Sequence, residues 1–243
     1  MNKTFAIIGS GGYIAKRHKE AIKRIGGNIV ADYDPLLPNT TPPKYLFGYK
    51  FDYLVICSPS DTHYEYIKMG LENNKKIICE KPAFLPWQPI IDNNDINIVL
   101  QYRFLRLKDY MKNPTKVKVK MVRDKKYLKS SKMDSRKTGG IFFNLFVHYI
   151  DLALQYNCDF DGYVSTEGEQ YRLVESGNKD YDLDSIPAED LYERMYKKIV
   201  NEDKGVKPKD IMYLRWWLER HSEIFGYGQE IVNSSGVFIK SKF

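Results

Sequence analysis

The sequence predicts an α/β protein: an N-terminal Rossmann domain with a doubly wound parallel sheet, then a reduced α+β domain with a small, mostly antiparallel sheet. Near the N-terminus, short apolar runs alternate with helical patterns, as in βαβ units. A glycine-rich segment follows the first apolar run, where such sheets hold a phosphate. From residue 117, apolar and charged residues alternate, which is typical of an antiparallel strand with one face in water. We expect the two domains at residues 1–102 and 103–243.

The predicted elements of the first domain follow one another as strands of a parallel sheet joined by crossovers. Ser60 or Asp61 is expected to cap the second helix. Three prolines in residues 36–50, and three more in residues 80–95, leave no room for a long helix in either connection. Strands are expected at residues 5–9, 28–34, 53–57, 76–79 and 96–100, and helices at residues 15–25 and 62–73.

The second domain is predicted to mix strands with helices. The alternating pattern in residues 117–122 predicts an antiparallel strand, and residues 159–184 have the composition of strands and turns. Residues 140–156 are apolar with a helical pattern. Two further helices are expected at residues 189–200 and 208–225, the latter with a proline in its first turn.

The composition is that of a globular chain of 243 residues, of which 43% are hydrophobic and 28% charged. No apolar stretch approaches the roughly 20 residues that cross a bilayer, and the N-terminus lacks the apolar core of a cleavable signal. Cys57, Cys79 and Cys158 are scattered without a C-x-x-C pair, so neither a disulfide framework nor a metal site is indicated. We therefore expect a cytoplasmic protein with reduced thiols, no metal and no membrane partner.

The formal net charge is +7, and much of the excess lies in residues 116–137. Such an excess of positive charge can favour binding to nucleic acid, to a membrane surface or to anionic small molecules. No recognised DNA- or RNA-binding motif accompanies it, so we expect no nucleic-acid partner. The segment is either a solvated, lysine-rich strand face or a surface that binds phosphate.

The glycine loop has the spacing Gly9-x-x-Gly12-x-x-Ala15, which differs from the usual G-x-G-x-x-G. Asp34 ends the second predicted strand, close to the ~20-residue separation expected of the acid in a dinucleotide fingerprint. A carboxylate there accepts hydrogen bonds from a ribose 2′-OH and repels a 2′-phosphate, which favours NAD over NADP. The pyrophosphate is expected at the helix N-terminus. The alternative is a glycine-rich turn without a ligand.

Two further segments make a family resemblance specific. Cys79-Glu-Lys-Pro82 and Ile56-Cys-Ser-Pro-Ser-Asp-Thr-His63, with the glycine loop, resemble the Gfo/Idh/MocA family of sugar and cyclitol oxidoreductases. The segment Asn144-Leu-Phe-Val-His-Tyr-Ile-Asp151 fits the histidine motif of that family, and its spacing predicts Asn144, His148 and Asp151 on one helical face. The displaced glycine loop, residues 127–137 and Asn144 are similar to the UDP-N-acetylglucosaminuronic acid 3-dehydrogenases within the family.

The resemblance implies an NAD-dependent dehydrogenase that oxidises the C3 hydroxyl of a nucleotide-linked sugar, UDP-N-acetylglucosaminuronic acid, in glycan biosynthesis. Lys81 would hold the hydroxyl oxygen and His148 would take its proton. Recycling of NADH in place by 2-oxoglutarate, and a homo-oligomer (dimer or tetramer), are further implications. Three interpretations stay open: this activity, the same fold acting on another sugar or cyclitol, and a site that binds NAD or a nucleotide sugar without turnover.

The resemblance also implies the rest of the site, residue by residue. Two of these residues also have an explanation without a ligand. His63 could act only locally at the start of a helix, and Glu80 could be a solvated acid at the end of a strand. The catalytic residues are Lys81 and His148; the cofactor-binding residues are Gly9, Gly12, Tyr13, Ile14, Asp34, Ser58, Pro59, His63, Glu80, Lys81 and Gln101; the substrate-binding residues are Arg103, Lys129, Arg136, Lys137, Asn144 and His148.

The chain departs from the family in length and at one motif position. Family members are generally longer, so the second domain is expected to be shortened, including the sheet whose outer face usually makes the dimer contact. Phe146 stands two residues before the histidine, where the family usually has glycine. A ring there would narrow the substrate pocket or fill space left by missing strands.

Overall fold

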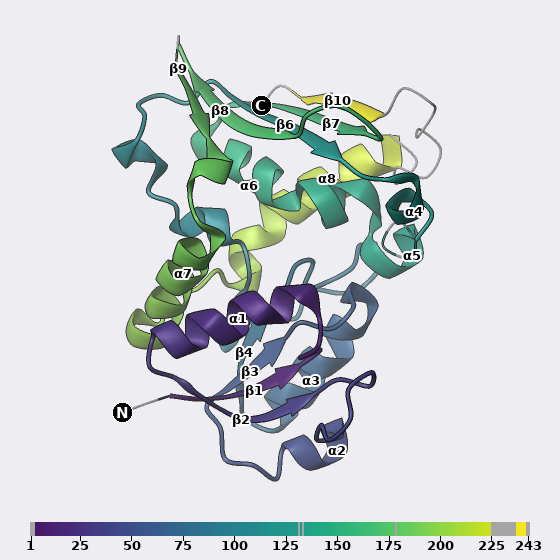
Figure 1. Cartoon of the computed structure of the whole chain (residues 1–243), viewed down its shortest axis with the longest axis vertical. Helices are drawn as coiled ribbons and strands as arrows, with labels where there is room; N and C mark the ends of the chain where they lie inside the picture. The colour runs from purple at the N-terminus through teal and green to yellow at the C-terminus, as the bar shows by residue number, and fades with distance from the viewer. Residues whose placement is uncertain (1–2, 131, 133, 178, 225–236, 242–243) are drawn as a thin grey trace. The chain divides into compact units, whose positions relative to one another are not determined.

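The computed structural model describes residues 3–130, 132, 134–177, 179–224 and 237–241 (Figure 1). The chain divides into two compact units: Met1–Val99 with Ala188–Met212, and Leu100–Pro187 with Tyr213–Phe243. The predicted domains, residues 1–102 and 103–243, differ from this division because the chain returns to the first unit at Ala188. The predicted fold class is confirmed, since one sheet is parallel and the other mostly antiparallel.

The first unit is built on a parallel five-stranded sheet of order β2-β1-β3-β4-β5. Strands β3 and β4 consist almost wholly of buried apolar residues, as expected where helices cover both faces of a parallel sheet. The strand order reverses between β1 and β3, and ligands bind parallel sheets at the carboxyl ends of strands flanking such a reversal. The strands are β1 (Thr4–Ile8), β2 (Asn28–Tyr33), β3 (Tyr53–Ile56), β4 (Lys76–Cys79) and β5 (Ile96–Ile98).

The helices of the first unit are α1 (Tyr13–Arg24), α2 (Pro43–Leu46), α3 (His63–Glu72) and α7 (Ala188–Glu202). Helix α3 begins after a 3₁₀ turn at Ser60–Thr62, and its N-cap Thr62 makes no side-chain capping bond, so neither predicted cap acts. Helix α2 has a single turn, in keeping with the prolines around it. Helix α7 packs along α1 (Figure 1).

The second unit contains a five-stranded sheet of order β10-β7-β6-β8-β9. Its central strand β6 shows the predicted alternation, with Val117, Val119 and Met121 buried and the lysines between them turned outward. The predicted antiparallel pairing of this strand is found with β8, but β6 also pairs parallel with β7, which the pattern did not predict. The strands are β6 (Lys116–Val122), β7 (Asp159–Ser165), β8 (Tyr171–Ser176), β9 (Lys179–Asp182) and β10 (Val237–Ser241).

The predicted helix at residues 140–156 is divided. Phe142–Phe146 form a π-helical segment, and α6 covers Val147–Tyr156. A π turn adds one residue to the helical repeat, so side chains before and after it no longer share one face. The helix predicted at 208–225 starts as a 3₁₀ turn (Pro208–Ile211) and continues as α8 (Met212–Ile224), while Phe225 lies outside the described residues.

Further short elements of the second unit are α4 (Lys125–Leu128), α5 (Ser135–Thr138) and the 3₁₀ turns η2 (Gln101–Phe104), η3 (Leu107–Asp109) and η6 (Leu183–Ser185). Among the helices that the structure describes, none has the length and apolar character needed to cross a membrane.

The close approach of α3 to the parallel sheet depends on Gly70. A Cβ atom at this position would overlap Cδ1 of Ile77 and lie 3.0 Å from Cδ2 of Leu54, and both side chains are fully buried. Replacing a helical glycine with alanine gains about 1 kcal/mol through backbone entropy. Overpacking a core costs about 1–3 kcal/mol, so we expect the steric cost to exceed the entropic gain.

We therefore predict that Gly70→Ala lowers the free energy of unfolding, measured by urea denaturation, by about 1 kcal/mol net of these two effects. Lys68→Ala, at an exposed position of the same helix, is the control and should change it by less than about 0.5 kcal/mol. Stabilisation by Gly70→Ala would show that α3 does not press on the sheet as described.

Candidate cofactor and catalytic site

The glycine loop leaves the carboxyl end of β1 and turns sharply into α1. Gly9 has φ +79°, and its N–H donates to the Tyr33 carbonyl at 2.8 Å. A Cβ atom at Gly9 would lie 2.5 Å from the backbone nitrogen of Ser58, so both conformation and space require glycine there. Gly12 is the N-cap of α1, and its N–H donates to the Gly9 carbonyl at 3.2 Å. The loop is therefore held tightly against the segment that follows β3.

The N-terminus of α1 has the properties of an anion site. Gly12 provides no side-chain cap, and the first turn of the helix contains no acidic residue. Ser10 Oγ is buried in the loop and has no hydrogen-bond partner among the residues that the structure describes. Free N–H groups and the helix dipole favour a phosphate at such a terminus. These residues fit the pyrophosphate of a dinucleotide.

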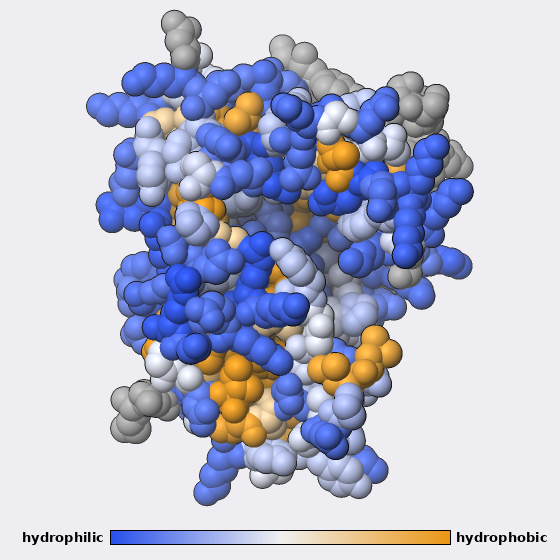
Figure 2. All heavy atoms as spheres, viewed as in Figure 1, coloured by the Kyte–Doolittle hydropathy of each residue, from blue (hydrophilic) through white to orange (hydrophobic). Residues whose placement is uncertain are grey.

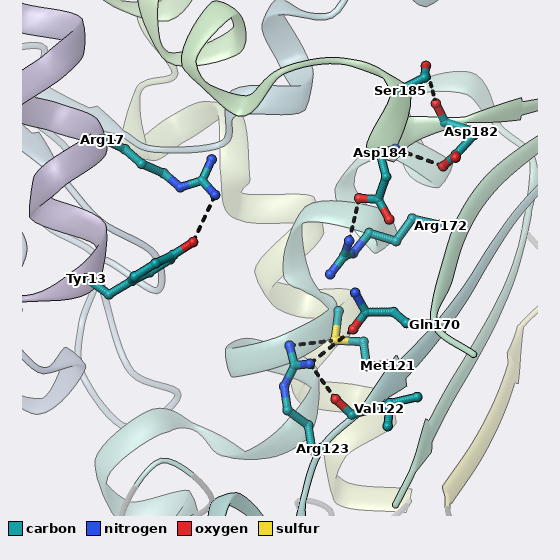
Figure 3. A network of polar contacts seen from close by, with 10 residues as sticks. All are labelled: Tyr13, Arg17, Met121, Val122, Arg123, Gln170, Arg172, Asp182, Asp184 and Ser185. Atoms are coloured by element: carbon teal, nitrogen blue, oxygen red, sulfur yellow. Dashed lines mark hydrogen bonds and ion pairs between the residues drawn. The ribbon is translucent and has the colours of Figure 1, made fainter. Parts of the chain in front are cut away.

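Tyr13 and Ile14 come directly after this N-cap. Tyr13 is 73% exposed, whereas Ile14 is half-buried. The Tyr13 hydroxyl accepts a hydrogen bond from Arg17 Nη2 at 3.2 Å (Figure 3). The pair sits on the first two turns of α1, and Arg17 is half-buried.

Asp34 follows β2 and ties the glycine loop in place. Its Oδ2 accepts a hydrogen bond from the Gly11 N–H at 2.9 Å, and its Oδ1 accepts one from the Leu36 N–H at 2.9 Å. A carboxylate oxygen has two lone pairs, so each can accept a second hydrogen bond. The carboxylate is thus fixed in orientation by the backbone and still chemically suited to a ribose diol.

The segment after β3 is joined to the segment after β4 by His63. The ring is buried, with Nδ1 2.8 Å from the Pro82 carbonyl and Nε2 2.8 Å from the Ser58 carbonyl. Burial lowers the pKa of His63, although both carbonyls oppose the shift. Ser58 Oγ lies 2.7 Å from Thr62 Oγ1, and Pro59 is exposed. His63 therefore shapes the sheet edge through the backbone.

Glu80 directly follows β4 and is not the solvated acid that one alternative allowed, since it is only 6% exposed. Its Oε1 lies 3.0 Å from His18 Nε2 and accepts a hydrogen bond from the Tyr192 hydroxyl at 2.9 Å. Its Oε2 accepts the Lys81 N–H at 3.2 Å. Contact of Glu80 with a ribose stays a prediction. Lys81 is half-exposed at the carboxyl edge of the sheet.

In the second unit, Arg103 binds Asp151 with a planar two-point contact. Its Nε donates to Oδ2 at 2.9 Å and its Nη2 donates to Oδ1 at 2.6 Å. Asp151 is 1% exposed and also accepts a hydrogen bond from Gln155. Arg103 therefore anchors η2 to α6. Gln101, in the same turn, has a buried Oε1 without a partner in the described part of the chain.

Asn144 and His148 stand out in the π-helical segment and α6. All residues from 138 to 153 except Asn144 and His148 are buried, including Asp151 and Phe146. Asn144 Nδ2 donates to the Lys132 carbonyl at 2.5 Å, and the His148 ring meets the Tyr102 ring edge-on at 6.2 Å. Of the three residues predicted to share one face, Asn144 and His148 are half-exposed, whereas Asp151 is buried and bound by Arg103.

The sequence left open whether the Phe146 ring narrows the substrate pocket or fills space left by missing strands. Phe146 is fully buried and meets the Phe160 ring edge-on at 5.6 Å. The ring therefore fills the core of the second unit between α6 and β7.

The basic segment has two different parts. On β6, Lys116 pairs with Asp161 and Lys118 with Glu175 on neighbouring strands, which neutralises two of the lysines on this strand face. The predicted substrate cations, by contrast, lie on or beside the short helices α4 and α5 and are exposed. Figure 2 shows hydrophilic residues gathered over this region. These cations are Lys129, Arg136, which pairs with Asp134 at 3.2 Å, and Lys137.

Some polar residues of both units were not predicted from the sequence. Arg172 of β8 pairs with Asp184, and Arg123 donates to Gln170 at 3.2 Å (Figure 3). Tyr192 reaches Glu80 from α7, 112 residues away in the chain. No local pattern marks such residues, because their function depends on pairing between distant segments.

Comparisons with known proteins agree with this geometry. A model of the Gfo/Idh/MocA oxidoreductase family, NAD-binding Rossmann fold, matches residues 31–95. The chain is 26% identical over 185 residues to the glucose-6-phosphate 3-dehydrogenase of Bacillus subtilis (strain 168), a match that covers 62% of this chain and 53% of that protein. The chain thus spans about half the length of this curated relative.

Solved structures resemble the whole fold. The WlbA (WbpB) dehydrogenase from Thermus thermophilus, in complex with NAD and UDP-GlcNAcA, has a TM-score of 0.71 at 24% identity, over 90% of this chain and 94% of that one. A myo-inositol dehydrogenase from Corynebacterium glutamicum has a TM-score of 0.68 at 14% identity, over 98% and 99%. At these identities the likeness shows the fold, and the family match confirms NAD as the cofactor of the first unit.

The cysteines are predicted to be unreactive. Burial, and then the charge of Glu80, raise the pKa of Cys57 and Cys79, and burial raises the pKa of Cys158 to about 11. At pH 8, roughly one thiol in a thousand with such a pKa is a thiolate, and the thiolate is the nucleophile. A disulfide reagent at pH 8 should therefore label the native protein very slowly, and label all three cysteines after unfolding in guanidinium chloride. Rapid labelling of the native protein would contradict the described burial.

Proposed function

Because residues 31–95 match the model of the Gfo/Idh/MocA family of NAD-binding oxidoreductases, we propose that the chain oxidises the C3 hydroxyl of a nucleotide-linked sugar, with UDP-N-acetylglucosaminuronic acid as the first substrate. The observation that carries this proposal is Lys81, which stands half-exposed at the carboxyl edge of the NAD-binding sheet, directly after the buried Glu80. A lysine in this position can donate a hydrogen bond to a substrate oxygen.

Oxidation of a secondary alcohol removes a hydride from carbon and a proton from oxygen, and bound NAD⁺ supplies the hydride acceptor. In the proposed reaction Lys81 orients the hydroxyl oxygen, and His148 accepts its proton. An imidazole suits this role because its ordinary pKa, about 6.5, lies near working pH. The half-exposed position of His148 in an otherwise buried segment supports the assignment.

The proposed substrate is anionic, and two observations support this. Lys129, Arg136 and Lys137 are exposed, and only Arg136 of these three has an ion pair that the structure shows, with Asp134. On β6, Lys116 and Lys118 are paired with acids of neighbouring strands. Guanidinium forks and ammonium groups bind phosphate and carboxylate well. In addition, the Bacillus subtilis relative is named for glucose 6-phosphate, and the Thermus thermophilus dehydrogenase has been solved in complex with UDP-GlcNAcA; both sugars are anionic. Glucose 6-phosphate is therefore the second candidate substrate, favoured by the relative that matches in sequence.

We extend the proposal to recycling of NADH by 2-oxoglutarate in a homo-oligomer. The Thermus thermophilus dehydrogenase has also been solved with NAD and alpha-ketoglutarate; that structure has a TM-score of 0.69 at 24% identity, over 90% of this chain and 95% of that one. If recycling occurs here, free NADH does not accumulate, so absorbance would miss turnover. Product mass is then the appropriate readout.

The test is incubation of the protein with NAD⁺ and a panel led by UDP-N-acetylglucosaminuronic acid and glucose 6-phosphate, with and without 2-oxoglutarate. We predict loss of two hydrogens from one of these sugars. Lys81→Met should lower kcat by about 10²–10⁴-fold, the usual range for a group that assists proton transfer. The dissociation constant for NAD⁺, measured by calorimetry, should stay nearly unchanged.

Lys68→Met, an exposed lysine on α3, is the matched control and should keep full turnover. Turnover retained by Lys81→Met would exclude this mechanism. Binding of NAD⁺ without oxidation of any sugar in the panel would favour another sugar or cyclitol, or a protein that binds without turnover.

A further inference from the structure

We propose that Tyr192 and His18 are positioning residues: they hold the Glu80 carboxylate, and through it the backbone of Lys81. The orientation of Lys81 would then depend on α7, a helix that lies more than a hundred residues further along the chain. The inference rests on the proposed function, in which Lys81 meets the substrate hydroxyl.

The contacts divide the two oxygens of Glu80 between two tasks. Tyr192 Oη lies 2.9 Å and His18 Nε2 lies 3.0 Å from Oε1. The second oxygen, Oε2, accepts the Lys81 N–H at 3.2 Å. One side of the carboxylate is therefore fastened to two helices, and the other side restrains the peptide at which Lys81 begins.

The protons of this network can be assigned from the chemistry of its groups. When Glu80 is ionised, its carboxylate only accepts hydrogen bonds, and both Tyr192 Oη and His18 Nε2 then donate to it. His18 Nδ1 lies 2.7 Å from the Tyr196 hydroxyl, which can donate to a neutral ring. Burial, and then the charge of Glu80, raise the pKa of Tyr192 well above its ordinary value, so its hydroxyl remains a donor at any working pH.

The donors themselves are held by packing. The His18 ring meets the rings of Tyr192 and Tyr196 edge-on, at 5.1 and 5.7 Å between centroids. At the C-terminal end of α1, Arg24 Nη1 lies 3.1 Å from Asp190 and 3.3 Å from Glu193 on α7. His18, Tyr192 and Tyr196 are all nearly or fully buried. The hydroxyl of Tyr192 is thus positioned by two helices that contact each other along their length.

Several groups surround the carboxylate, and only some can restrain Lys81. Cys57 and Cys79 flank Glu80 but keep their protons, because burial raises the pKa of both thiols. The strong donors that the structure shows at Oε1 are Tyr192 and His18. Hydrogen bonds to charged acceptors are roughly twice as strong as neutral ones, so losing one should let the carboxylate turn and relax its contact with the Lys81 amide.

The decisive variant is Tyr192→Phe, which keeps the ring and removes only the hydroxyl. We expect the amide resonance of Lys81 in ¹⁵N-labelled protein to shift, and its hydrogen exchange to accelerate. We also expect kcat for sugar oxidation to fall by about tenfold, or about 1.4 kcal/mol in the barrier, while the dissociation constant for NAD⁺ changes by less than about twofold. A merely structural residue would not separate kcat from cofactor affinity in this way.

Tyr53→Phe is the matched control, since Tyr53 is a buried tyrosine of the same unit whose ring stacks on Phe5 at 5.3 Å. It should leave kcat and the Lys81 amide unchanged. At position 18, His18→Gln keeps a donor that can reach Glu80 and should retain more activity than His18→Leu.

The proposal is overturned if Tyr192→Phe leaves the Lys81 amide and kcat at wild-type values, or if it alters only thermal stability. Should the wild type oxidise no sugar at all, the proposed function is wrong, and the amide response of Lys81 alone decides whether Tyr192 and His18 position it.

Discussion

A carboxylate buried at the end of a parallel strand needs hydrogen-bond donors, and Glu80 obtains them from two helices that are distant in sequence. His18 of α1 and Tyr192 of α7 both reach Oε1. A buried carboxylate left without any donor would cost several kcal/mol. The return of the chain to the first unit at Ala188, with α7 packed against α1, brings Tyr192 to this carboxylate. Glu80 also fixes the peptide before Lys81, the residue on which the proposed chemistry depends.

A second acid acts on the neighbouring loop in the same way. Asp34 uses both oxygens to hold backbone N–H groups, one of them in the glycine loop. The His63 ring links the segments after β3 and β4, because each of its nitrogens lies against a backbone carbonyl of one segment. The cofactor edge of the sheet consists largely of irregular backbone, and these three side chains restrain it. A site held in this way needs little rearrangement when a ligand binds, which favours affinity and rate.

The sequence predicted those parts of the fold that local patterns encode. Apolar runs identified the five parallel strands, and the glycine loop with Asp34 predicted an NAD-binding unit, which the family match confirms. Features that depend on distant partners were missed: the return of α7, the parallel pairing of β6 with β7, and the edge strand β10. The π-helical segment was missed for another reason, because one extra residue in a turn hardly alters an apolar pattern.

The candidate site follows the same division. Motifs placed Lys81 at the end of β4 and His148 on a helix, and the structure shows both half-exposed. The family resemblance implied that Arg103 lies near the substrate. Its two-point contact with the buried Asp151 could not be foreseen, since the partner lies 48 residues away. Likewise, nothing local distinguishes Tyr192 from the other tyrosines of this chain.

The most direct test of the account is a titration of ¹⁵N-labelled protein with NAD⁺ and, separately, with NADP⁺, followed through the backbone amides of Gly11, Gly12 and Leu36. NAD⁺ should move all three, because they lie in the glycine loop or bind Asp34. NADP⁺ should bind at least about tenfold more weakly, a difference of roughly 1.4 kcal/mol, because its 2′-phosphate would face the Asp34 carboxylate. Unmoved loop amides at saturating NAD⁺, or equal affinity for the two dinucleotides, would contradict the assignment of this edge as the NAD site.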